Sequence, residues 1–338
     1  ECMMADIEAS KEEKTESPMN TESEPLKVNV KSHRYLSIDA VKGLLMIFAV
    51  YCHTIQSMSF GDLQERAYFS IPNDIDFTLI LNGFESSIVM IISTLGNLIP
   101  VSFYLFIGFG IQIFYNNRLY SKNWSHIKIS KYLIIRGILL FLVGIIESLI
   151  FGISYLFIEG FRILTSVLIY LGVIFIILIP LVRLYIYSVN IGYIVTFILI
   201  ILCVASSELI TPKPTEVEPD NILLLLLYIP GTNGLYISTF TLIPWLTISL
   251  LGTLLGNIFN NKSYSIESKF KVIKIWTVTA IILFVFIRVM NVLNDVEPTF
   301  GNFGYSWLYN EFRLNYIHFF YTTKYPCSLA YILIHIIL

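Results

Sequence analysis

The organisation of this chain follows from an apolar run near its start, SIDAVKGLLMIFAVYCH at residues 37–53. The run predicts a membrane-crossing helix with polar chemistry at both ends. Asp39 is placed to cap the helix start, and Lys42 marks a polar boundary. The run then stays apolar until His53, and an ionisable residue at the edge of a span is a functional candidate. Because Asp39 and His53 are about four turns apart, they share one helix face at a separation of about 21 Å.

Each of these polar side chains also has a purely structural interpretation. Asp39 can act as a helix cap and nothing more, and Lys42 can anchor the helix at the membrane interface. His53 can be a solvated residue at the membrane boundary. The pattern alone leaves both interpretations open.

The composition supports a membrane setting for the whole chain. Hydrophobic residues make up 56% of the 338 residues and charged residues 14%, whereas soluble domains carry roughly 25% charged residues. The mean hydropathy is +0.73. The net charge of −2 argues against a nucleic-acid partner. The 4 cysteines show no C-x-x-C spacing, so neither a disulfide framework nor a metal site is predicted.

The fold class predicted is all-α, a polytopic helical membrane protein with about eight transmembrane helices. Residues 1–33, rich in Glu, Lys, Ser and Thr, are expected to be a disordered cytoplasmic tail, and residues 34–338 form the membrane domain. Spans are expected at residues 40–58, 132–151, 163–182, 191–206, 237–259 and 273–293, with a half-helix at 222–229.

Two apolar stretches do not fit a simple span. Residues 88–115 are too long for one straight crossing and contain Pro100, so we expect a short inserted piece followed by a helix from about Leu98. Residues 328–338 are too short to cross the hydrocarbon core. The final helix is therefore expected to be truncated.

The basic residues of the loops predict an orientation with a cytoplasmic N-terminus. With the N-terminal tail inside, most Lys and Arg residues fall on inside loops, and few fall outside. The outside set is Arg66, Arg162, Lys213, Arg313 and Lys324.

Five segments carry a family resemblance. They are RYLSIDAVKG at residues 34–43, PVSFYLFIG at 100–108, RGILL at 136–140, IPWLTISLLG at 243–252 and FYTTKYPCSL at 320–329. Together they resemble the heparan-α-glucosaminide N-acetyltransferase catalytic domain, within the transmembrane acyltransferase superfamily. The last segment is similar to the Thr-x-Lys-Tyr-Pro-Pro-Ser-Leu signature of that branch, with Cys327 in place of the second proline. Lys42 stands where these families usually have Arg, which gives a point charge without a bidentate fork.

The resemblance implies transfer of an acetyl group from cytosolic acetyl-CoA to an amine or hydroxyl of a sugar on the outer face. His53 would be the base or the acetyl carrier, and Asp39 is a further candidate catalytic residue. Lys324 and Tyr325 would hold the sugar or the polarised carbonyl, although both also suit interfacial anchors. Contact with acetyl-CoA would fall to four basic residues, namely Lys42, Arg118, Lys128 and Arg136. No metal is expected, and the cell membrane is the expected location.

Other functions stay open at this stage. The runner-up acyltransferase is a polysaccharide O-acyltransferase. A transporter or scaffold would use Asp39, Glu147 and Arg288 as a polar pathway, although the sequence shows no internal repeat. Near Arg288, the residues Asn291 and Asn294 recur at helical spacing. The sequence leaves open whether the chain forms a homo-oligomer.

Overall fold

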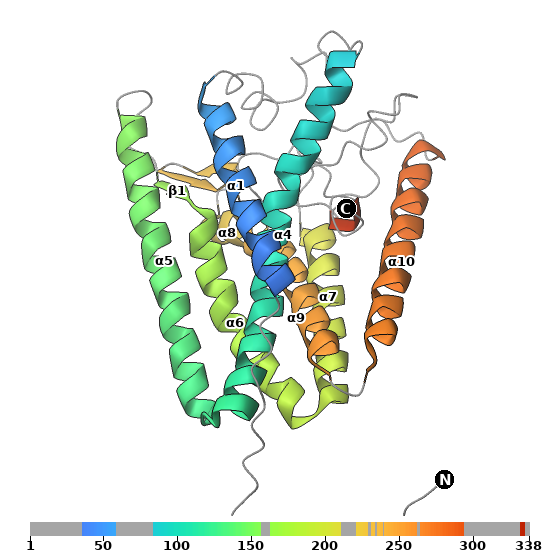
Figure 1. The fold of residues 1–338 in the computed structure, drawn as a ribbon. Coiled ribbons are helices and arrows are strands. Elements are labelled where there is room, and N and C mark those ends of the chain that lie inside the picture. The colour runs from blue at the N-terminus through green and yellow to red at the C-terminus, as the bar shows by residue number, and fades with distance from the viewer. Residues whose placement is uncertain are drawn as a thin grey trace, which may run out of the picture. The chain divides into compact units, whose positions relative to one another are not determined.

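Long apolar helices make up most of the described part of the chain. A computed structural model describes residues 36–58, 84–156, 163–210, 221–228, 231–233, 235–238, 240–261, 264–293 and 332–334. The helices are α1 (Leu36–Met58), α4 (Phe84–Lys122), α5 (His126–Leu156), α6 (Val167–Tyr187), α7 (Val189–Ile210), α8 (Ile222–Leu227), α9 (Leu242–Asn260) and α10 (Ile266–Leu293). Figure 1 shows their arrangement.

Six helical segments among the described residues are long and apolar enough to cross a membrane. They are Leu98–Lys122, His126–Ile153, Val167–Tyr187, Val189–Ser207, Leu242–Asn260 and Ile266–Ile287. The predicted all-helical, polytopic membrane protein is confirmed. The described residues contain six candidate spans, whereas the lengths of the apolar runs predict about eight.

The second apolar stretch forms one helix, which corrects the prediction of two pieces. α4 runs for 39 residues from Phe84 to Lys122 with Pro100 inside it. Proline removes one backbone hydrogen bond, but membrane helices tolerate this loss where neighbouring groups compensate. The apolar span within α4 begins at Leu98, close to the predicted helix start.

A small sheet replaces two predicted helix starts. β1 (Ile163–Thr165) and β3 (Tyr236–Ser238) pair in parallel, and β2 (Gly231–Asn233) pairs antiparallel with β3, giving the order β1-β3-β2. The adjoining spans α6 and α9 therefore start at Val167 and Leu242 rather than at residues 163 and 237.

Buried hydroxyl groups form hydrogen bonds within and beside this sheet, and between the sheet and α6. The Thr165 hydroxyl donates to the carbonyl of Ile237 at 3.1 Å. The Ser238 hydroxyl donates to the carbonyl of Phe240 at 2.7 Å. The Tyr170 hydroxyl on α6 lies 3.0 Å from the Ser238 hydroxyl oxygen, within hydrogen-bond distance. The polar backbone of a short sheet is thereby satisfied next to apolar helices.

Small residues bring α9 close to α4. A Cβ atom at Gly108 would overlap the carbonyl of Ser249, and one at Gly256 would lie 2.9 Å from the Phe109 carbonyl oxygen. The Ser249 hydroxyl donates to the Tyr104 carbonyl at 2.9 Å. The Gly252-x-x-x-Gly256 pattern is therefore a helix-packing face, as close approach through small residues predicts.

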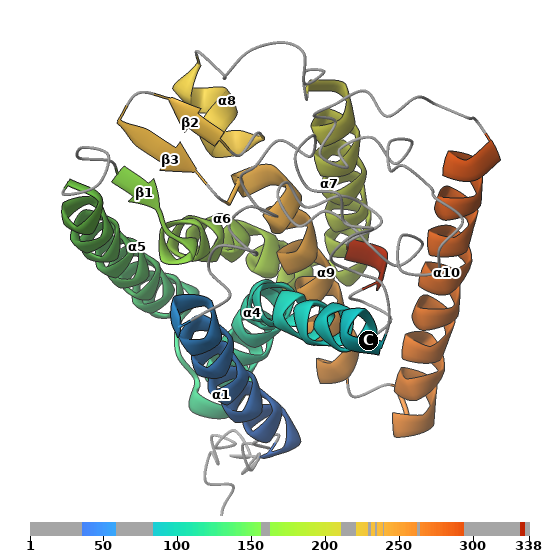
Figure 2. The ribbon, with the colours of Figure 1, turned by 90° about the horizontal axis from the view of Figure 1, so that it is seen from above.

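The remaining helices pack around this pair (Figure 2). α6 and α7 contact α9, α5 covers α6, and α1 lies against α4. α10 packs through Ala280, Phe284 and Ile287 against Leu333 and Ile334 of the last described segment.

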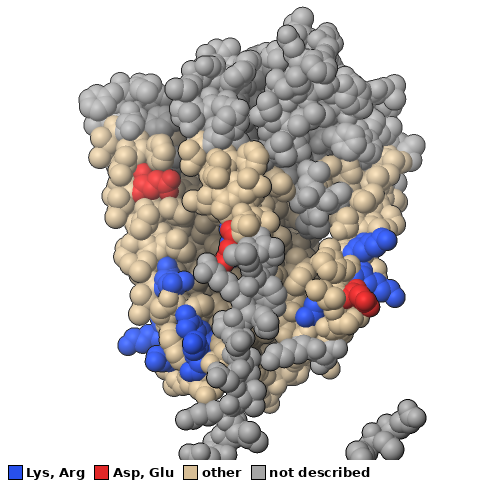
Figure 3. Space-filling model, in the orientation of Figure 1, with Lys and Arg blue, Asp and Glu red and all other residues tan. Residues whose placement is uncertain are grey.

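The described basic side chains gather toward one end of the helices (Figure 3). That end holds the C-termini of α4 and α6 and the N-termini of α5 and α10, and we call it the basic end. Apart from Lys42, the basic residues whose side chains are described belong to these helix ends: Arg118, Lys122, Lys128, Lys131, Arg136, Arg183, Lys269, Lys271 and Lys274.

Candidate functional site

A tight turn joins α4 to α5 at the basic end. Asn123 adopts a left-handed conformation with φ of 50°, which asparagine tolerates better than most residues. The backbone N–H of Trp124 donates to the Arg118 carbonyl at 3.0 Å. This bond adds a partner to a backbone carbonyl near the end of α4, where the last carbonyls have no partner within the helix. It folds Trp124 back over the last turn of α4, beside Arg118.

The start of α5 is fixed by its own cap. The Ser125 hydroxyl accepts from the backbone N–H of Lys128 at 3.3 Å, as expected for an N-cap serine. One residue later, His126 Nδ1 lies 3.0 Å from the hydroxyl of the buried Tyr115 on α4. These bonds hold the two helix ends in a defined relation.

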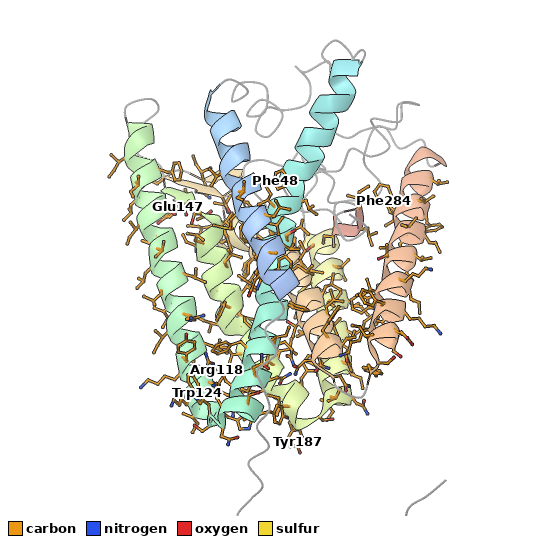
Figure 4. The ribbon with its side chains drawn as sticks, in the orientation of Figure 1. Phe48, Arg118, Trp124, Glu147, Tyr187 and Phe284 are labelled. Carbon is orange, nitrogen blue, oxygen red and sulfur yellow. The ribbon has the colours of Figure 1, made fainter. Side chains whose placement is uncertain are left out.

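Three basic and three aromatic side chains meet at this turn. We call this group the basic–aromatic cluster, and its members are Phe114, Arg118, Trp124, Lys128, Tyr132 and Arg136. Figure 4 shows Arg118 and Trp124 side by side at the basic end. The cluster unites three of the four residues predicted to contact acetyl-CoA.

The aromatic rings hold the cations at contact distance. The Arg118 guanidinium lies 4.8 Å from the Trp124 ring centre and 5.1 Å from that of Phe114. Lys128 Nζ lies 4.6 Å from the Trp124 ring centre, and the Arg136 guanidinium lies 4.6 Å from that of Tyr132. Each cation–π contact is worth about 0.5–2 kcal/mol, depending on how far it is desolvated.

No carboxylate among the described residues neutralises the cations of the cluster. Within the described residues, Arg118, Lys128 and Arg136 form no ion pair with a carboxylate. Lys128 and Arg136 are exposed, and Arg118 is half-buried. The arrangement therefore offers three cations and several aromatic rings to an anion that carries an aromatic group.

Lys42 lies apart from this cluster, against the middle of α4. Its Nζ atom is 5.4 Å from the Phe106 ring centre and 3.9 Å from where a Cβ atom of Gly110 would lie. Both partners fall well inside the Leu98–Lys122 span. Lys42 therefore lies beside the middle of the candidate span of α4, and its place at a polar boundary stays a prediction.

The other predicted residues of the first helix lie on α1. Asp39 is in the first turn rather than before it, where a carboxylate still favours the helix dipole. Asp39 and His53 share this one continuous helix, which confirms the helix but leaves their roles as predictions. The His53 side chain lies outside the described residues. Lys42 and His53 are separated by about three helical turns, or about 16 Å along the helix.

The remaining predicted residues are only partly described. Lys324, Tyr325 and Asn294 lie outside the described residues. Arg288 and Asn291 belong to α10, and only their backbone is described.

Among the described residues, two further polar features lie inside the helices, an unpaired carboxylate oxygen and an amide pair between helices. Glu147 on α5 is half-buried, and its Oε2 atom has no hydrogen-bond partner among the described residues. Figure 4 shows it toward the end of α5 opposite the basic end. The Gln112 amide donates to Asn257 Oδ1 at 3.3 Å between α4 and α9, a contact that sequence reasoning missed. Among the described residues, no group of His, Cys, Asp and Glu is placed to hold a metal ion.

Comparison with known proteins identifies the family. The sequence model of the family described as heparan-alpha-glucosaminide N-acetyltransferase, catalytic, matches residues 34–288. The match includes the cluster, α1 and the IPWLTISLLG segment at residues 243–252, and it ends before the 320–329 segment. No curated protein and no solved structure matches the chain. This integral membrane protein belongs to the heparan-α-glucosaminide N-acetyltransferase catalytic-domain family.

Proposed function

We propose that this protein transfers an acetyl group from cytosolic acetyl-CoA to the amine, or a hydroxyl, of a glucosaminide-type sugar on the outer face of the membrane. The observation that carries the proposal is the basic–aromatic cluster, in a chain of an N-acetyltransferase family. The basic end then faces the cytoplasm, with the N-terminus on that side, as the positive-inside rule predicts. The cell membrane is the proposed location.

The cluster suits the nucleotide end of acetyl-CoA. CoA carries several phosphate charges and an adenine ring, and the cluster supplies guanidinium groups for phosphates next to an indole and two other rings. Arginine forks match phosphate oxygens in pairs, and aromatic faces stack on bases. Basic residues at an inner membrane surface also have a purely topological cause, so their number alone supports nothing. Their grouping around aromatic rings favours a role in binding acetyl-CoA over this topological cause.

The positions along α1 and α4 suggest a path for the acetyl group. Arg118 lies at the basic end of α4, whereas Lys42 contacts Phe106, about 18 Å further along that helix. His53 lies about 16 Å beyond Lys42 along α1. With the nucleotide on the cluster, the thioester arm would extend toward Lys42, whose ammonium can attract the carbonyl oxygen.

The proposed chemistry needs a base and a path for one proton. In direct transfer, the sugar nitrogen or oxygen attacks the thioester carbonyl, the imidazole of His53 takes the proton of the nucleophile, and the CoA thiolate leaves and is protonated. In the relay alternative, the imidazole attacks the thioester carbonyl and the CoA thiolate leaves and is protonated. The sugar nitrogen or oxygen then attacks the acetyl carbon, the bond to the imidazole breaks, and the imidazole takes the proton of the nucleophile. Asp39 lies on the same helix, and Lys324 and Tyr325 are proposed to hold the sugar or the carbonyl.

A binding measurement tests the donor site. Arg118→Gln should weaken acetyl-CoA binding to the purified chain at least about tenfold, because a charged hydrogen bond to phosphate is worth about 1.5 kcal/mol or more. Lys274→Gln is the matched control, since it removes an exposed positive charge at the same end of the molecule. Equal binding by Arg118→Gln and the unchanged chain would remove the cluster from the donor site.

A further inference from the structure

A surface groove lies at the basic end of α6, away from the basic–aromatic cluster. It has a volume of about 320 Å³ and is lined by Pro180, Arg183, Leu184 and Tyr187. Pro180 and Leu184 are four residues apart, as are Arg183 and Tyr187, so the four side chains form one strip along the helix. None of them belongs to the cluster.

The strip changes in polarity along the helix. Pro180 and Leu184 present apolar surface, and Arg183 adds a cation beside them. Tyr187 is the last residue of the α6 span, and its side chain is 85% exposed. Figure 4 shows it at the basic end of the helices. A phenol and a snorkelling arginine at a span end match the level of lipid headgroups.

The charge of the groove selects the ligand. Arg183 is exposed and forms no ion pair within the described part of the chain. A free anion would need only the guanidinium group, whereas the apolar surface of Pro180 and Leu184 in the same groove matches an acyl chain. We propose that this groove binds an anionic phospholipid of the leaflet at the basic end, with its phosphate on Arg183 and the start of an acyl chain on Pro180 and Leu184.

Native mass spectrometry of the purified full chain tests this site with phosphatidylglycerol and phosphatidylcholine as probes. The unchanged chain should bind phosphatidylglycerol more tightly than phosphatidylcholine. Arg183→Gln should lose about fivefold in that affinity, the contribution of one basic side chain at an anionic membrane surface. Arg183→Lys, which keeps the charge but not the fork, should lose less. Lys274→Gln should bind as the unchanged chain does.

Three results would overturn the proposal. The first is full phosphatidylglycerol affinity in Arg183→Gln. The second is an equal loss in Lys274→Gln, which would show general attraction to the basic end. The third is displacement of the lipid by excess glycerol phosphate, which would show a site for free phosphate. The unfolding temperature of each variant without added lipid shows whether it is folded.

Discussion

Replacing Gly252 with alanine tests how closely α9 approaches α4. The added Cβ atom would overlap the Leu105 carbonyl oxygen and lie 2.9 Å from its carbonyl carbon. Carbon atoms in ordinary contact are about 3.5 Å apart, so the helices must separate by at least about 0.6 Å. The obstructing atoms are backbone and cannot rotate away. We expect an overpacking cost of about 3 kcal/mol, of which the helix propensity of alanine offsets at most about 1 kcal/mol.

The free energy of unfolding should therefore fall by about 2 kcal/mol. It can be measured by titrating the purified chain in mixed micelles with a denaturing detergent and following tryptophan fluorescence, to which the buried Trp245 of α9 contributes. Gly43→Ala is the matched control, because its Cβ atom would meet nothing within 4 Å. That variant should be as stable as the unchanged chain or slightly more stable. Unchanged stability of Gly252→Ala would refute the close packing of α4 and α9.

Two further predictions concern the turn and the interhelical amide pair. Asn123→Gly should leave the unfolding temperature unchanged, whereas Asn123→Val should lower it, because the left-handed conformation costs an ordinary L-residue about 1–2 kcal/mol; equal temperatures for the two variants would contradict the turn geometry. Gln112→Leu should lower the free energy of unfolding by about 1 kcal/mol, since it leaves the buried Asn257 amide without its partner. Adding Asn257→Leu should then cost less than Asn257→Leu alone, and strict additivity in this double-mutant cycle would show that the amides do not interact.

Local patterns were sufficient to predict most of the spans. Apolar runs of about twenty residues predict membrane helices, and α5, α7 and α10 cover the predicted ranges. The helix starts at residues 163 and 237 were wrong because β1 and β3 pair across more than seventy residues. Three-residue apolar strands cannot be told from helix ends by periodicity.

The candidate site was only partly predictable, although the sequence held an overlooked signal. Arg118, Lys128 and Arg136 each follow an aromatic residue by four positions, namely Phe114, Trp124 and Tyr132. That spacing places each pair on one helix face or across the turn. The three pairs come together in one cluster only because the α4–α5 turn places the start of α5 beside the end of α4.

The mid-span position of Lys42 lay beyond sequence reasoning. It depends on how far α1 is shifted along α4, which is a tertiary relation. No local propensity or periodicity encodes such a shift.

The most direct test of the proposed activity is release of free CoA from acetyl-CoA by the purified chain in a bilayer, with glucosamine as acceptor and His53→Ala measured beside it. The proposal predicts acceptor-dependent release that disappears in His53→Ala. Release that survives in His53→Ala would move the chemistry away from this histidine. No release, together with no acetyl-CoA binding, would contradict the acetyltransferase proposal and favour a transporter or scaffold.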